Sequence, residues 1–347
     1  MTDARDLAAW MRDAKEFREV DLANQFPDNK SLWYEFSCAI KYGIVKQLNN
    51  DTYRWIGPAQ TAPETEGSPQ KYSDQALGDI LYYDWQNNLP VLEHAYKARE
   101  FVLVIGPAGS GKTQLVRRFN AIMKRKVREI NFSLRTRESH LVGTKGIHEG
   151  NTYFIEGILP QSMREGSTLY CDELSAAEPD VLIRLDEALD DRRQLGLKEN
   201  DGEVVNAHPD WWVVATINPV TYAGVKELPA QIISRFPVRI YLKYPPPDVE
   251  MQIVKLHVKE MANRESVELA ITLANKLRER ADVGDIPYSP TIRETIAFTR
   301  LVNQGMNAAT VATAVFGNVY QQWGEIEAQK VNDLIVSLFG MEKGAQE

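Results

Sequence analysis

The stretch from Phe101 to Thr113, FVLVIGPAGSGKT, constrains this chain more than any other. Five apolar residues lead into a glycine-rich loop with the spacing G-x-x-x-x-G-K-T. This pattern predicts a buried strand over 101–105 and a loop whose backbone N–H groups point inward at a polyphosphate. A helix over about 112–124 would direct the positive end of its dipole at the same point. The sequence therefore predicts a nucleoside triphosphate site, in which Lys112 reaches the outer phosphates.

The expected cofactors are ATP and Mg²⁺, and the Thr113 hydroxyl is a predicted Mg²⁺ ligand. Nine consecutive residues are expected to contact the nucleotide: Gly106, Pro107, Ala108, Gly109, Ser110, Gly111, Lys112, Thr113 and Gln114. We expect the end of another strand to bring a carboxylate to the metal site, because Mg²⁺ prefers oxygen ligands.

Composition narrows the class of protein. The 347 residues are 44% apolar and 25% charged, which fits a soluble globular chain of two or three domains. No apolar run is long enough to span a membrane, and the first residues do not resemble a secretion signal. With only Cys38 and Cys171, reduced thiols in a cytoplasm are expected. The net charge of −8 argues against general nucleic-acid binding.

Four segments are predicted along the chain. Residues 1–57 should form a small helical unit that ends in a hairpin, a pattern that resembles a winged-helix module. Residues 58–71 have the composition of a linker. Residues 72–244 should form an α/β domain, with helical material from Leu77 to Tyr96 ahead of the core, and residues 245–347 an all-helical lid. In the first segment, one helix is expected to contain Leu7, Trp10, Met11 and Phe17, and another Leu32, Trp33, Phe36 and Ile40.

Strands alternate with helical segments in the α/β domain, so we expect a five-stranded parallel sheet with helices on both faces. The predicted strands cover 101–105, 127–132, 168–172, 211–217 and 238–242. Two hairpin-like inserts interrupt this pattern at 146–157 and 192–209. In the lid, helices are expected at about 291–303, 307–323 and 325–339.

The predicted strand 168–172 ends in a carboxylate pair, Asp172 and Glu173. Next to a phosphate loop, Asp172 would orient the Mg²⁺ shell and Glu173 would polarise the attacking water. The predicted strand 211–217 should lie between the two motif strands. Asn218 directly follows it and could touch the γ-phosphate or the water; a turn-forming Asn-Pro is the alternative.

Two arginines are further candidates. Arg235, at the end of a short predicted helix, cannot easily reach its own nucleotide but could stabilise charge on a neighbouring subunit's phosphates. It could instead be a surface arginine beside the core residue Phe236. Arg293, in the first turn of a lid helix, could fold over the phosphates of its own subunit, or could serve as a capping or surface residue.

These motifs together resemble a known family. GPAGSGKT, LYCDELSAAEPD, ATINP, ISRF and SPTIR stand in the order and spacing of AAA+ ATPases, over about residues 100–300. The two inserts resemble the helix-2-insert clade, and the pattern is most similar to MoxR-type proteins of the CbbQ/NorQ kind and to the CobS chelatase subunit. The chain departs from MoxR proteins proper at residues 175–177, Ser-Ala-Ala in place of an Asn-Arg pair. Ser234 also replaces the usual Asp before the finger arginine, and Arg293 follows Ser289 by four residues.

The resemblance implies a Mg²⁺-dependent ATPase that forms a ring, expected to be a hexamer, with ATP between subunits. In such proteins hydrolysis remodels or activates a client protein or inserts a metal or cofactor, often through a partner with a von Willebrand A domain. The inserts are the expected contact elements, with Met163 and Arg164 near the first and residues 198–202 at the tip of the second.

Three alternatives remain open. The chain could be the ATPase motor of a metal chelatase, or a DNA-acting motor that binds DNA through residues 1–57. The acidic residues Glu149, Glu199, Asp201 and Glu203 in the inserts disfavour DNA. A switch that binds ATP without hydrolysing it is disfavoured by Glu173 and Arg235.

Overall fold

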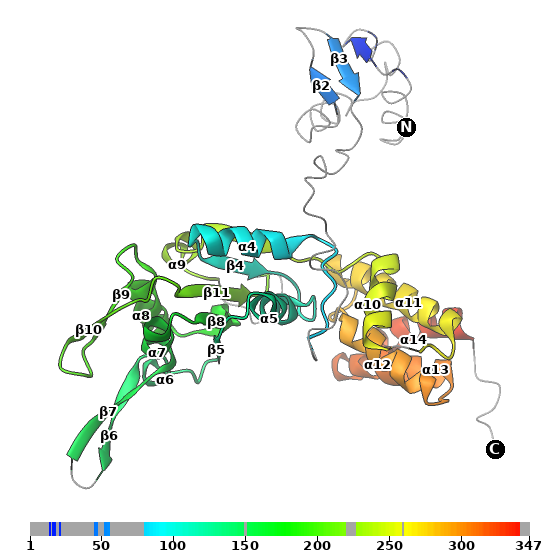
Figure 1. The fold of residues 1–347 in the computed structure, drawn as a ribbon. Coiled ribbons are helices and arrows are strands. Elements are labelled where there is room, and N and C mark those ends of the chain that lie inside the picture. Colours follow the sequence, from blue (N-terminus) through cyan, green and yellow to red (C-terminus); the bar gives the residue numbers. More distant parts are fainter. Residues whose placement is uncertain are drawn as a thin grey trace. The chain divides into compact units, whose positions relative to one another are not determined.

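The computed structural model describes residues 14, 16–18, 21, 45–47, 52–55, 80–148, 151–219, 227–258 and 260–340. The chain divides into two compact units, Met1–Lys71 and Tyr72–Glu347. Figure 1 shows the elements of both units. The predicted linker 58–71 lies outside the described residues.

The first unit contains a small antiparallel sheet in the order β1-β3-β2. Its strands are β1 (Glu16–Arg18), β2 (Val45–Gln47) and β3 (Thr52–Trp55). The β2–β3 pair confirms the two strands expected for the hairpin. Phe17 was expected on a helix, and that was wrong: it lies in β1 opposite Tyr53. Its spacing from Trp10 fits a helical face, but pairing with β3 decides its structure. The other residues of the two expected helices lie outside the described residues.

The second unit is built on a five-stranded parallel sheet, as expected, in the order β12-β4-β11-β8-β5. Its strands are β4 (Val102–Ile105), β5 (Val127–Asn131), β8 (Thr168–Asp172), β11 (Trp212–Ile217) and β12 (Val238–Tyr241). The inner strands β4, β8 and β11 are almost entirely buried, because helices cover the sheet (Figure 1). The order places β11 between β4 and β8, which confirms that prediction.

Aromatic residues pack the helices against this sheet. Trp212 of β11 contacts Tyr96 of α4 (Asn88–Ala98) and Phe119 of α5 (Lys112–Ile122), with ring centroids 5.6 and 5.3 Å apart. Helix α4 begins at Asn88 rather than in the expected stretch from Leu77, because the Asp84 carboxylate accepts the N–H groups of Asn88 and Leu89, both at 2.8 Å. Residues 81–87 are therefore left non-helical ahead of the core.

Both predicted hairpin inserts are present and project from the sheet domain (Figure 1). The first, β6 (Gly143–His148) and β7 (Asn151–Glu156), separates α6 (Glu138–Leu141) from α7 (Ile158–Glu165). The second, β9 (Gln194–Leu197) and β10 (Glu203–Asn206), follows α8 (Pro179–Leu189). Arg164 of α7 links them, because it pairs with Glu156 Oε1 at 2.7 Å and also with Glu203. Lys145 and Asp201, 3.6 Å apart, form a second link.

The C-terminal part is helical, as expected. Its α-helices are α10 (Pro247–His257), α11 (Arg264–Asp282), α12 (Ile292–Asn303), α13 (Ala308–Ala312) and α14 (Glu325–Phe339). The expected single helix over 307–323 is instead α13 followed by a π-helical turn, Thr313–Gly317, and a 3₁₀ turn, Asn318–Trp323. These changes of pitch keep Phe316 and Tyr320 in the same core, at 1% and 0% exposure. No helix in the described part of the chain is long and apolar enough to cross a membrane.

Candidate active site

The phosphate loop begins where β4 ends and closes on the first turn of α5. Gly109 and Gly111 have φ values of 68° and 94°, which L side chains rarely adopt. At Gly109 space is also limiting, because an added Cβ would lie 2.4 Å from Thr291 Cβ of the lid. Glycine is therefore required here both by the backbone and by the close approach of the lid.

Lys112 is held inside the loop. Its ammonium donates to the carbonyls of Gly106 and Pro107 at 2.7 and 2.9 Å, and to Asn218 Oδ1 at 2.8 Å. Burial lowers the pKa of Lys112 to about 8, although the nearby carboxylates Asp172 and Glu173 act in the opposite direction. The contact with Asn218 places the end of β11 directly beside the loop, where the sequence predicted it.

The Asp172 carboxylate is fixed by two hydroxyl groups. Its Oδ1 accepts hydrogen bonds from the Tyr170 hydroxyl, at 2.8 Å, and from Thr216 Oγ1. The Tyr170 hydroxyl also lies 3.2 Å from Thr113 Oγ1. Burial raises the pKa of Tyr170, so this hydroxyl keeps its proton and can donate it to the carboxylate. Tyr170 thus connects the two residues predicted to bind Mg²⁺.

Glu173 follows in an unusual backbone conformation. Its φ of 55° and ψ of 43° lie in the left-handed region, which is uncommon for a residue other than glycine. Its N–H donates to Thr216 Oγ1 at 3.1 Å. Such outliers concentrate at functional sites, which fits the predicted role of Glu173.

A cavity of about 360 Å³ gathers most of the predicted residues. It is lined at its polar end by Ala108, Gly109, Ser110, Gly111, Lys112, Thr113, Gln114, Asp172, Glu173, Asn218 and Arg293. Gly106 and Pro107 do not line it, but their carbonyls hold the ammonium of Lys112. The Arg293 backbone N–H donates to Thr291 Oγ1 at 3.1 Å, which fixes the first turn of α12 beside the loop.

Arg235 lies elsewhere. It does not line the cavity, and its guanidinium pairs with Asp186 Oδ1 at 2.8 Å and Asp190 Oδ1 at 3.3 Å. Hydrogen bonding to Asp186 raises the pKa of Arg235, so it is charged at all ordinary pH values. The structure therefore does not bring Arg235 to the nucleotide site of its own chain.

Sequence reasoning missed several residues around this cavity. The aromatic segment 81–85 and the lid residues Ile253, His257 and Ile296 form much of its less polar wall. For residues 81–85, the only signal in the sequence was the run of aromatic residues itself, LYYDW. Thr216 had a clearer signal, since a lone hydroxyl on a strand of otherwise apolar residues must find a hydrogen-bond partner.

The residues present fit ATP and Mg²⁺. A glycine-rich loop that leads into the N-terminus of α5 suits a polyphosphate, and Lys112 supplies a charge for it. Mg²⁺ usually takes one or two protein oxygens and completes its shell with phosphates and waters. Thr113 and Asp172, joined through Tyr170, form such a donor pair.

The parallel sheet, the phosphate loop and the adjacent carboxylate pair define a P-loop nucleotide-binding protein. Residues 101–236 match the family model of the AAA domain, dynein-related subfamily. An uncharacterized protein from Staphylococcus epidermidis is 32% identical over 221 residues, which is 62% of this chain and 80% of that protein. The chain belongs to the AAA+ ATPases. ATP binding and hydrolysis are properties of this family.

A named relative and a solved structure were also found. The denitrification regulatory protein NirQ from Stutzerimonas stutzeri is 29% identical over 259 residues, covering 70% of this chain and 84% of NirQ. A solved structure from Cytophaga hutchinsonii, described provisionally as an ATPase, has 19% sequence identity and a TM-score of 0.42. It covers 75% of this chain and 91% of that one.

Proposed function

We propose that this protein is a Mg²⁺-dependent, MoxR-like ATPase that works as a ring and remodels or activates a partner protein. One observation carries the proposal. The cavity holds Lys112, Asp172, Glu173 and Asn218 together, whereas Arg235 lies outside it. A site with a base and a metal ligand, from which Arg235 of the same chain is directed away, is suited to a neighbouring copy that supplies this arginine.

The residues divide the hydrolytic step among them. Glu173 accepts a proton from water as the water oxygen attacks the γ-phosphorus and the bond to the β–γ bridging oxygen breaks. Lys112 balances charge on the outer phosphates, and Asn218, already in contact with Lys112, orients the phosphate or the water. Mg²⁺ held by Thr113 and Asp172 would neutralise charge on the phosphate oxygens. Arg235 of a neighbouring copy would stabilise the charge on the transferred group.

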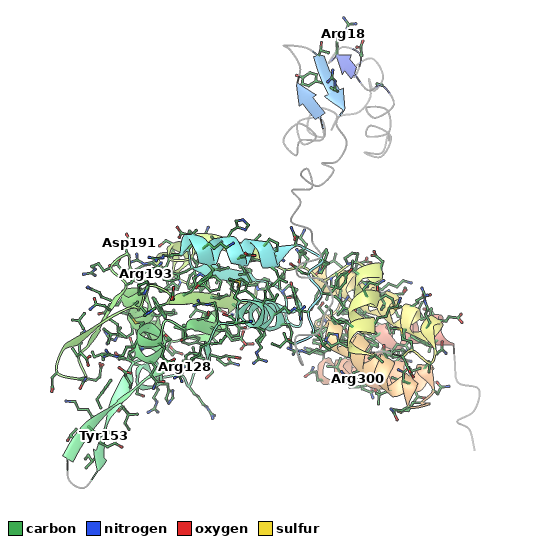
Figure 2. All side chains as sticks on the ribbon, viewed as in Figure 1. Arg18, Arg128, Tyr153, Asp191, Arg193 and Arg300 are labelled. Atoms are coloured by element: carbon green, nitrogen blue, oxygen red, sulfur yellow. The ribbon has the colours of Figure 1, made fainter. Side chains whose placement is uncertain are left out.

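The hairpin inserts support a protein client rather than DNA. On β7, Tyr153 (labelled in Figure 2) and Ile155 are 48% and 45% exposed. As residues i and i+2 of one strand, they share one face of the hairpin. Apolar exposure of this kind is typical of protein contacts. Met163, which the sequence placed near the contact elements, is fully buried and cannot serve as one. Arg164 instead joins the two hairpins.

The likeness to a denitrification regulatory protein supports a client that belongs to an enzyme system. By the family resemblance, we infer a hexameric ring in the cytoplasm and a partner with a von Willebrand A domain. We further propose that activation of the client consists of inserting a metal or cofactor into it. A chelatase motor would have the same site and would differ only in its partner.

ATP turnover and mass in solution test this proposal. The purified chain is assayed alone, with double-stranded DNA and with single-stranded DNA, and its mass is measured by light scattering with and without ATP. We expect ATP-dependent assembly and turnover that DNA does not change. Lys112→Ala, which removes the phosphate-binding charge, should abolish both.

Two outcomes would contradict the proposal. If the monomer hydrolysed ATP as fast as the assembled protein, a catalytic arginine supplied by a neighbouring copy would be excluded. A severalfold rise in turnover with DNA would make the protein a DNA-acting motor instead.

A further inference from the structure

Thr216 connects the two acidic residues of the site. It lies on β11 and is fully buried, one residue before the end of the strand. Its hydroxyl donates to Asp172 Oδ1 and accepts the backbone N–H of Glu173 at 3.1 Å. One hydroxyl group therefore holds the side chain of one acidic residue and the backbone of the next.

The direction of these bonds matters. A threonine hydroxyl has a single proton, and the N–H of Glu173 can only donate, so Thr216 must give its proton to Asp172. The bond thus holds the Asp172 carboxylate in one orientation through its Oδ1. Tyr170 engages the same carboxylate oxygen. Within the described part of the chain, both hydrogen bonds to this carboxylate go to Oδ1, so Oδ2 would be available to Mg²⁺.

The second bond acts on Glu173. A glutamate in the left-handed region is unfavourable by itself and persists only where its surroundings hold it there. The bond from Glu173 N–H to Thr216 is one such restraint. A second is the bond from the N–H of Ala176, three residues on, to the Glu173 carbonyl at 2.8 Å. The backbone turn at Glu173 directs its side chain into the cavity, where a general base must lie.

We propose that Thr216 is a positioning residue that orients Asp172 and Glu173 together through its hydroxyl. This inference rests on the proposed ATPase function. It requires the hydroxyl, not merely the shape of the side chain. A purely structural role would require only that the buried hydroxyl be satisfied or replaced by a methyl group of similar size.

The test compares Thr216→Val with Thr216→Ser. Valine keeps the shape and removes the hydroxyl, whereas serine keeps the hydroxyl. We expect Thr216→Val to lower kcat by about 10–100-fold, the usual effect of losing a group that orients a metal ligand. Its affinity for a fluorescent ATP analogue without Mg²⁺ should stay within about twofold of wild type, while the gain in affinity on adding Mg²⁺ should shrink. Thr216→Ser should have a kcat, and a gain in affinity on adding Mg²⁺, close to those of wild type.

Thr168→Val is the matched control. Thr168 is also fully buried in the sheet, at the first position of β8, and its hydroxyl donates to Asn120 Oδ1 at 2.6 Å, away from the site. The Thr168→Val variant should be less stable than wild type, but it should keep the wild-type kcat and the wild-type gain in ATP affinity on adding Mg²⁺. If Thr216→Val does not fold, Thr216→Ala provides the same comparison with less packing strain.

The outcomes distinguish a failure of the Thr216 role from a failure of the proposed ATPase function. If wild type hydrolyses ATP and Thr216→Val keeps its kcat, or if the serine variant is as impaired as the valine variant, the positioning role is wrong and the ATPase function stands. If wild type neither binds nor hydrolyses ATP, the proposed function itself fails.

Discussion

A buried ion pair in the lid offers the sharpest test of the structural reasoning. Glu250 of α10 is fully buried, and the Arg278 side chain of α11 is 5% exposed. Arg278 Nη2 donates to Glu250 Oε1 at 3.0 Å, and its Nε donates to the Pro290 carbonyl at 2.9 Å. Arg278→Met would leave the carboxylate with only Thr295, at 2.7 Å, and a long contact to Asn275.

The expected loss follows from the burial of the remaining charge. Removing one partner of a buried pair costs about 3–5 kcal/mol, because the other is left uncompensated. Urea unfolding followed by circular dichroism should show this decrease in the free energy of unfolding. The double variant Glu250→Met, Arg278→Met should recover most of it, since well-packed apolar residues can replace a buried pair at little cost.

The control lies on the same helix. Arg264 pairs with Glu268 at 2.8 Å, but both side chains are more than half exposed, at 68% and 53%. Arg264→Met should therefore cost about 1 kcal/mol or less. If Arg278→Met were no more destabilising than Arg264→Met, the reasoning from burial would be refuted.

Three predictions concern the nucleotide site. Burial lowers the pKa of Lys112 to about 8, so above that pH the ATP-free protein loses the positive charge of this side chain. ATP affinity should therefore fall by up to about tenfold per pH unit above pH 8. A Kd for ATP that stays constant from about pH 7 to pH 9.5 would contradict this prediction. Glu173→Gln should bind ATP normally but lower turnover by about 10²–10⁴-fold in a phosphate-release assay; a smaller effect would mean another base. Arg235→Ala should keep ATP affinity and lose about 10³-fold in turnover. An equal mixture with Glu173→Gln subunits, which bind ATP and keep Arg235, should restore about a quarter of the wild-type rate, since one interface in four pairs an intact site with an intact arginine. A mixture without activity would place Arg235 in cis.

Much of the core could be predicted from the sequence, because its signals are local. Glycine spacing and an apolar run suffice to predict the phosphate loop and β4, and the alternation of strands and helices predicts the parallel sheet. Residues 198–202 were expected at the tip of the second hairpin, and they do connect its strands β9 and β10. Phe17 shows the limit of such reasoning, since pairing with Tyr53 overrode an apparent helical pattern.

The rest depended on contacts between residues far apart in the chain. No local pattern indicates that Thr291 packs against Gly109, that Tyr244 donates to the Ala108 carbonyl at 2.9 Å, or that His257 lines the cavity. Arg164 was expected near one insert, but only the fold shows that it joins both.

The sequence by itself determined which chemical groups this protein has for binding a nucleotide, because short motifs fix their own backbone geometry. The tertiary structure alone decided how those groups are held. The placement of β11 between β4 and β8 brings Thr216 to Asp172 and Asn218 to Lys112. The fold also keeps Arg235 away from the site and pairs it with Asp186 of α8 and with Asp190, the residue after that helix. The physical reason is that hydrogen bonds and ion pairs depend on distances in space, which sequence separation does not set.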